Sequence, residues 1–103
     1  MNEKEIVNPS EVHELAVEKG WYDKSREVPE LLCLIHSEIS EALEGYRNNI
    51  PEGEKGWLGE ELADAVIRIW DMCDYLGIDI AKEVNKKHEY NKTRPYRHGE
   101  KKC

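Results

Sequence analysis

The sequence predicts an all-α fold made of one domain, residues 1–103. Apolar residues recur at helical spacing in four segments, and glycines and prolines separate these segments. No segment shows the alternation of a strand flanked by hairpin turns. A chain of 103 residues has the length of one domain, and short connections favour antiparallel neighbours, as in a helical bundle.

The first predicted helix begins at Asn8 and ends at Gly20. Asn8 can cap the first turn, Pro9 suits the first helical position, and Glu11 can complete a capping box. The apolar stripe of this helix consists of Val12, Leu15 and Ala16.

The second predicted helix begins near Val28 and ends at about Asn48, where a segment rich in Asn, Pro and Gly follows. Its apolar positions follow helical spacing and comprise Leu31, Leu32, Ile35, Ile39, Ala42 and Tyr46.

The third predicted helix runs from about Trp57 to Tyr75 and stops before Gly77. It is apolar nearly all round, which is typical of a helix that is central in its fold or buried in an oligomer interface. Asp79 can then cap a fourth helix that ends at Arg94-Pro95. The four histidines of the chain are expected on the surface or in the tail rather than as metal ligands.

Charge divides the chain into an acidic body and a basic end. Residues 1–85 hold 20 acidic and 8 basic side chains, whereas residues 86–103 hold 2 acidic and 7 basic ones. The tail, residues 92–103, continues this basic end. Such a distribution suits a metal site that receives an anionic substrate, and it disfavours a protein that coats nucleic acid, because that class usually presents a broad basic face.

The cysteines and the hydropathy favour a cytoplasmic protein. The three cysteines are odd in number and show no metal-ligand spacing, as expected of small core residues in a reducing compartment. No apolar run approaches the roughly 18 residues of a membrane span. The segment Met1–Glu5 lacks the pattern of a signal peptide, so neither a membrane nor a secreted location is expected.

Two acidic pairs at the same spacing are the strongest functional signal. Glu38 and Glu41 lie three residues apart in the second helix, and Glu61 and Asp64 do so in the third. Residues at this spacing are neighbours on a helix surface, and both pairs lie at the same edge of an apolar face. Antiparallel packing of these two faces would bring the four carboxylates together.

The ligand type favours Mg²⁺, with Mn²⁺ as a substitute, because the set is all carboxylate. A di-iron bundle site needs Glu-x-x-His, and no histidine in this chain has Glu three residues before it. The competing interpretation is a solvated acidic face, since Glu11/Glu14 and Glu27/Glu30 repeat the spacing at helix starts. The matching register of the two pairs favours a metal site.

These motifs resemble a known family. Glu38-x-x-Glu41, nineteen further residues and Glu61-x-x-Asp64 are similar to the signature of the MazG-like, all-α nucleoside triphosphate pyrophosphohydrolases. The segment 85–95, Asn-Lys-Lys-His-Glu-Tyr-Asn-Lys-Thr-Arg-Pro, is similar too, and the resemblance covers about residues 30–98. Ser37 stands where the fuller pattern often has Glu.

The resemblance implies a four-helix MazG-like bundle completed by oligomer packing, as a homodimer or homotetramer. It implies Mg²⁺-dependent hydrolysis of an NTP or dNTP between the α and β phosphates, giving a monophosphate and pyrophosphate. The four acidic residues of the two motifs would hold the metal, and Glu38 or Glu41 would also handle the attacking water. The candidate substrate contacts are Lys86, Tyr90, Asn91 and Arg94.

Two other classes of function remain open at this point. The first is a non-catalytic helical module for oligomerisation or regulation that keeps the fold without the reaction. The second is nucleic-acid binding through the basic tail, which the acidic body opposes. The intact set of four acidic residues favours the enzyme, because a non-catalytic module has no need of all four.

Overall fold

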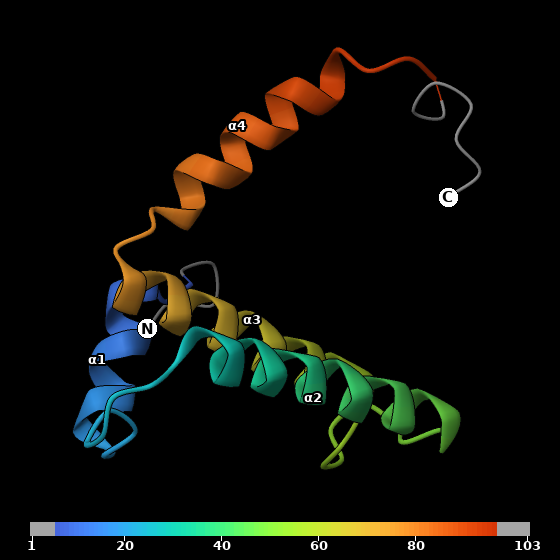
Figure 1. The fold of residues 1–103 in the computed structure, drawn as a ribbon. Coiled ribbons are helices and arrows are strands. Elements are labelled where there is room, and N and C mark those ends of the chain that lie inside the picture. Colours follow the sequence, from blue (N-terminus) through green and yellow to red (C-terminus); the bar gives the residue numbers. More distant parts are fainter. Residues whose placement is uncertain (1–5, 97–103) are drawn as a thin grey trace.

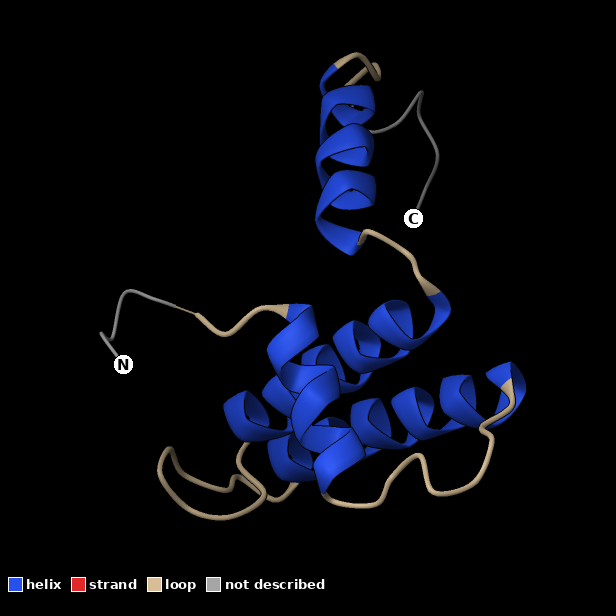
Figure 2. Ribbon diagram, turned by 90° about the vertical axis from the view of Figure 1, so that its left-hand side faces the viewer, coloured by secondary structure: helices blue, strands red, loops and turns tan. Residues whose placement is uncertain are grey.

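The computed structural model describes residues 6–96, which form four α-helices and contain no strand. The helices are α1 (Pro9–Glu18), α2 (Val28–Arg47), α3 (Leu58–Leu76) and α4 (Ile80–Lys92) (Figure 2). The all-α prediction is confirmed, and each helix lies where the sequence predicts it. Of the basic tail at residues 92–103, the part from residue 97 onward lies outside the described residues.

Side-chain caps and left-handed residues set the helix ends. The Oδ1 atoms of Asn8 and Asp79 accept hydrogen bonds at 2.8 and 3.0 Å from the third residue beyond them, as N-caps do. Gly77 ends α3 with a φ of 74°, and the next residue, Ile78, donates its backbone N–H to the carbonyl of Cys73 at 2.8 Å. This is the pattern of a Schellman motif, in which glycine is favoured because it adopts positive φ without strain.

Three of the four helices form a packed body. α3 is central: α2 runs antiparallel to it, and α1 packs against it as well (Figure 1). α4 has no comparable packing with any other helix in residues 6–96, and it leads away from the body after a short connection. Within one chain the bundle therefore comprises three helices, and completion by another copy stays a prediction.

The core of the body is thin. The buried apolar residues are few and mostly small, namely Val12, Leu31, Ala42, Ala65 and Cys73. Large apolar side chains on the same helices stay exposed: Ile39 is 49% exposed, Leu43 53% and Leu62 44%. A body of this kind leaves apolar surface for a partner, because contiguous exposed apolar area commonly marks an interface.

One buried charge ties α1 to α3. Asp71, 7% exposed, lies 2.8 Å from Nδ1 of His13 through its Oδ1 atom and accepts a hydrogen bond from the hydroxyl of Tyr22 at 2.7 Å through Oδ2. The ring of Tyr22 in turn lies against Tyr75, with ring centroids 4.5 Å apart. The expectation that the histidines are surface or tail residues is wrong for His13, whose side chain is only 19% exposed. Its ring turns inward because the buried carboxylate of Asp71 requires a hydrogen-bond partner.

Burial raises the pKa of the Tyr22 hydroxyl, and the hydrogen bond to Asp71 and the charge of that carboxylate raise it further. The hydroxyl therefore stays protonated at neutral pH and acts as a donor. Its removal would leave one oxygen of Asp71 without a hydrogen-bond partner among the described residues.

We expect Tyr22→Phe to lower the free energy of unfolding by about 1–3 kcal/mol, the usual cost of leaving a buried polar group unsatisfied. Urea unfolding followed by circular dichroism measures this change. Tyr46→Phe is the matched control, because Tyr46 is 68% exposed and should change stability very little. Equal stability of the two variants would contradict the role assigned to Asp71.

A close approach of backbone holds α2 to the connection before α3. A Cβ atom added at Gly45 would lie 2.1 Å from the carbonyl oxygen of Gly56, closer than atoms can approach. The glycine therefore permits a contact that no other residue allows. We expect Gly45→Ala to lower the free energy of unfolding by about 1–3 kcal/mol through overpacking, although alanine is the better helix former.

Thermal and urea unfolding of Gly45→Ala test this expectation. Ser40→Ala is the matched control, since Ser40 is exposed on the same helix and loses no contact of this kind. A stabilised Gly45→Ala protein would show that helix propensity outweighs the clash.

Candidate metal centre

Three of the four predicted metal ligands converge. Glu38 of α2 and Glu61 and Asp64 of α3 each offer a carboxylate oxygen, and these three oxygens lie within 4.8 Å of one another. All three residues are half-buried. We call these three residues the acidic cluster.

The packing of α2 on α3 produces this arrangement. The helices are antiparallel, so the middle of α2 faces the first half of α3. Ala42, one turn after Glu38, is 4% exposed, and Ala65, next to Asp64, is 3% exposed. Small side chains at a helix contact allow the axes to approach closely, which brings acidic groups at the edge of the contact near one another.

Glu41, the fourth predicted ligand, is exposed and does not belong to the cluster. Its charge still contributes to raising the pKa of Glu61, so the two carboxylates lie within electrostatic range. The geometry therefore separates three carboxylates that could hold one ion from a fourth beside them. This distinction was not available from the spacing of the motif alone.

The cluster shows the electrostatic signature of crowded like charges. Partial removal from water raises the pKa of Glu61 above its ordinary value, and the charges of Asp64, Glu41, Glu38 and Glu60 add to that effect, in this order. The pKa of Asp64 is raised mainly by desolvation and then by Glu38 and Glu60. A cation that neutralises the cluster would remove this repulsion, so the oxygen-only donor set fits a hard divalent ion.

Arg68 is a member of the site that the motif analysis missed. Its Nε donates a hydrogen bond to Oε1 of Glu38 at 2.8 Å, and its charge lowers the pKa of Asp64. Its guanidinium carbon lies 5.0 Å from the ring centroid of Trp21. One signal was present in the sequence: Arg68 follows Asp64 by four residues on the same helix, the spacing at which side chains meet.

The predicted substrate residues lie apart from the cluster within one chain. Lys86, Tyr90 and Asn91 are exposed on α4, and Arg94 follows the end of that helix. The ring of Tyr90 lies near two cations, with Nζ of Lys87 at 4.7 Å and the guanidinium carbon of Arg94 at 5.7 Å. α4, which carries these residues, leads away from the body that holds the acidic cluster (Figure 1).

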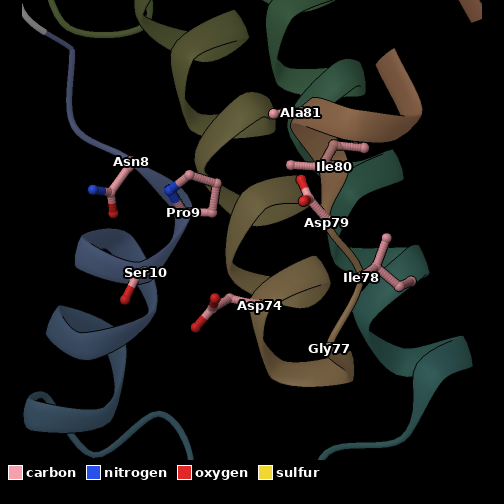
Figure 3. A pocket seen from close by; sticks show the side chains of 9 residues that line it. All are labelled: Asn8, Pro9, Ser10, Asp74, Gly77, Ile78, Asp79, Ile80 and Ala81. Atoms are coloured by element: carbon pink, nitrogen blue, oxygen red, sulfur yellow. The ribbon is translucent and has the colours of Figure 1, made fainter. Parts of the chain in front are cut away.

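Two hollows of the described surface lie elsewhere. A cavity of about 390 Å³ lies where α1 begins, α3 ends and α4 begins, and the carboxylate of Asp74 points toward α1 there (Figure 3). None of the residues that line it is basic, so it suits an anionic substrate poorly. A wide groove along α4 includes Lys82, Asn85 and Lys86 and is open to solvent.

No family model, curated protein or solved structure matches this chain. Among the helices of residues 6–96, none combines the length and the apolar character needed to cross a bilayer.

We expect Mg²⁺ to stabilise the fold through the acidic cluster. Binding to the native state alone adds about 2.7 kcal/mol to the free energy of unfolding at a concentration 100-fold above the dissociation constant. Thermal unfolding with and without Mg²⁺ at neutral pH measures the effect. Asp64→Asn should lose most of it, whereas Glu14→Gln, an exposed acidic position on α1, should keep it.

The pH dependence has a defined sign. The pKa values of Asp64 and Glu61 are raised in the native state above their ordinary values of 3.8 and 4.5. Without metal, the contribution of these two groups to stability therefore falls as pH rises from the ordinary pKa values through the native ones. Protons compete with the metal, so the Mg²⁺ effect should grow over the same range. A Mg²⁺ effect that is independent of pH would contradict binding at these carboxylates.

Proposed function

We propose that the protein is a Mg²⁺-dependent nucleoside triphosphate pyrophosphohydrolase of the MazG-like kind. It would cleave an NTP or dNTP between the α and β phosphates, and it would thereby clear surplus or non-standard nucleotides from the cytoplasmic pool. The observation that carries the proposal is the approach of Glu38, Glu61 and Asp64 to within 4.8 Å across two helices. Their sequence motifs are those of the resemblance.

The residues divide into distinct roles. Glu38, Glu61 and Asp64 hold the ion, with Mn²⁺ as a substitute for Mg²⁺. When bound, the ion neutralises charge on the phosphates and lowers the pKa of a bound water. Glu41 is the better candidate to orient the attacking water and accept its proton, because it is exposed beside the cluster and outside the ligand set. Glu38 is already engaged by Arg68.

The assembly proposed is a homodimer or homotetramer. Apolar side chains on the outer faces of α2 and α3 remain exposed, and α4 has no comparable packing on another helix within residues 6–96. The exposed side chains include Leu32, Ile39, Leu43, Leu62 and Val66. α4 carries four lysines and two glutamates, whereas α2 and α3 are acidic. Opposite charge and exposed apolar surface favour packing of α4 on another copy.

This assembly would supply the predicted substrate contacts. Lys86 and Arg94 would bind phosphates, Asn91 would hydrogen-bond the nucleotide, and Tyr90 would stack on the base, in the site of a neighbouring copy. A nucleic-acid polymer is not proposed as a partner, because the body of the chain is acidic.

The second candidate function is a non-catalytic helical module for oligomerisation or regulation. The exposed apolar faces favour it as much as they favour an oligomeric enzyme. The two functions differ in whether the acidic residues matter, so substitutions of these residues distinguish them.

We expect purified protein to release pyrophosphate from at least one member of a panel of NTPs and dNTPs when Mg²⁺ is present, and EDTA to abolish the release. Glu61→Gln and Asp64→Asn should lower kcat/KM by at least about 100-fold through loss of the metal. Glu41→Gln should lower kcat by about 100-fold or more while metal binding persists, the usual range for a general base.

Glu44→Gln is the matched control, because Glu44 is an exposed acidic residue on α2 that pairs with Arg47 at the surface. Product analysis should give monophosphate and pyrophosphate in equal amounts. An oligomer that releases neither product from any nucleotide would favour the non-catalytic module, and release of inorganic phosphate would place the cleavage at a different bond.

A further inference from the structure

Arg68 has donors that no described residue uses. A guanidinium carries five N–H donors in one plane. Only the Nε–H of Arg68 is engaged, with Glu38, and neither Nη group has a hydrogen-bond partner in the part of the chain that the structure describes. The side chain is 32% exposed, so part of it is open to solvent beside the acidic cluster.

The side chain is held in place from two sides. Glu38 fixes the Nε edge, and the indole of Trp21 supports one face of the guanidinium at 5.0 Å. Trp21 is itself anchored by Arg26, whose guanidinium carbon lies 4.2 Å from the ring centroid and whose Nε donates to the Trp21 carbonyl at 2.7 Å. A donor group that is already oriented loses little conformational entropy when it binds a ligand.

The charge at this position suits an anion only after a cation is bound. Arg68 contacts Glu38 and its charge lowers the pKa of Asp64, but the three carboxylates of the cluster outnumber the one guanidinium, so the metal-free cluster repels a phosphate. A divalent cation held by the cluster would, together with Arg68, offset the charge of the three carboxylates and so relieve the repulsion of a polyphosphate. The planar fork of Nη1 and Nη2 matches two phosphate oxygens, a geometry that lysine cannot provide.

We propose that Arg68 is a phosphate-binding residue of the site, and that its two Nη groups bind a phosphate of the triphosphate next to the cation held by the acidic cluster. This inference rests on the proposed function and adds to it a substrate contact that comes from the same helix as two of the metal ligands. It differs from the α4 residues, which lie away from the cluster of their own chain.

The competing role for Arg68 is purely structural, as a salt bridge between α3 and α2. The loss of a purely structural salt bridge would leave anion affinity unchanged in protein that is still folded. Anion affinity therefore separates the two roles.

Inorganic tripolyphosphate in the presence of Mg²⁺ is the probe, and isothermal titration calorimetry measures its affinity for the full chain. We expect Arg68→Lys to weaken binding by at least tenfold although the charge is retained, and Arg68→Gln to weaken it further. Arg47→Gln is the matched control, since it removes an exposed arginine on α2 that pairs with Glu44. Its affinity should stay within twofold of wild type.

A second measurement follows the metal without substrate. Because Arg68 competes with a cation for Glu38, Arg68→Gln should bind Mn²⁺ at least as tightly as wild type, as measured by electron paramagnetic resonance. Weaker Mn²⁺ binding would mean that the substitution damages the cluster and would overturn the assignment. Circular dichroism verifies that each variant keeps its helix content, and Arg68→Lys tests the fork if Arg68→Gln does not fold.

The outcomes separate this inference from the proposed function. Wild-type affinity for tripolyphosphate in Arg68→Lys, or no Mg²⁺-dependent binding in wild type, overturns the role of Arg68. Pyrophosphate release that persists with an unchanged KM in Arg68→Lys would leave the proposed function intact and refute this contact. Binding that depends on Arg68 in a protein that hydrolyses no nucleotide would support the contact and refute the proposed reaction.

Discussion

α2 and α3 pack antiparallel through small buried side chains, and the candidate site depends on that contact. Ala42 and Ala65 are nearly inaccessible, and Gly45 lets the connection between the helices approach the end of α2 without a clash. Close packing partly removes the carboxylates of Glu61 and Asp64 from water and brings like charges near them, and both effects raise the pKa values of these two groups. A bound cation would relieve the mutual repulsion of these carboxylates, which otherwise opposes the packing that brings them together.

The helices and their ends could be predicted from the sequence because local signals specify them. Asn8, Gly77 and Asp79 set the ends of helices through contacts with residues a few positions away. Helical spacing alone was enough to distinguish the acidic edge of α2 and α3 from their apolar face. The acidic cluster could be predicted in part, because the local spacing of residues sets the face of each helix on which the acidic side chains lie. That Glu41 lies outside the cluster could not be predicted, because the place of a residue at the edge of a helix contact depends on how the two helices approach.

Two contacts that sequence reasoning missed join distant segments. Arg68 meets Glu38 across 30 residues, and Asp71 meets His13 across 58. No pattern of spacing marks such pairs, since each requires the tertiary fold before the side chains can meet. The position of α4 was unpredictable for the related reason that its amphipathic character does not say which surface it packs on. In the same way, the sequence does not say which surface the exposed apolar residues of α2 and α3 would pack on.

The buried Asp71 network also has a consequence for the order of folding. α2 and α3 are joined by a connection of ten residues, so they can associate early at a low cost of loop closure. α1 meets α3 through contacts such as His13 with Asp71, which are far apart in sequence, so their formation carries a larger cost of loop closure and we expect them to form later. Interactions absent from the transition state act mainly on the unfolding rate. The pairing of His13 and Tyr22 with Asp71 would therefore set how long the native state lasts, while the α2–α3 pair would set how fast it forms.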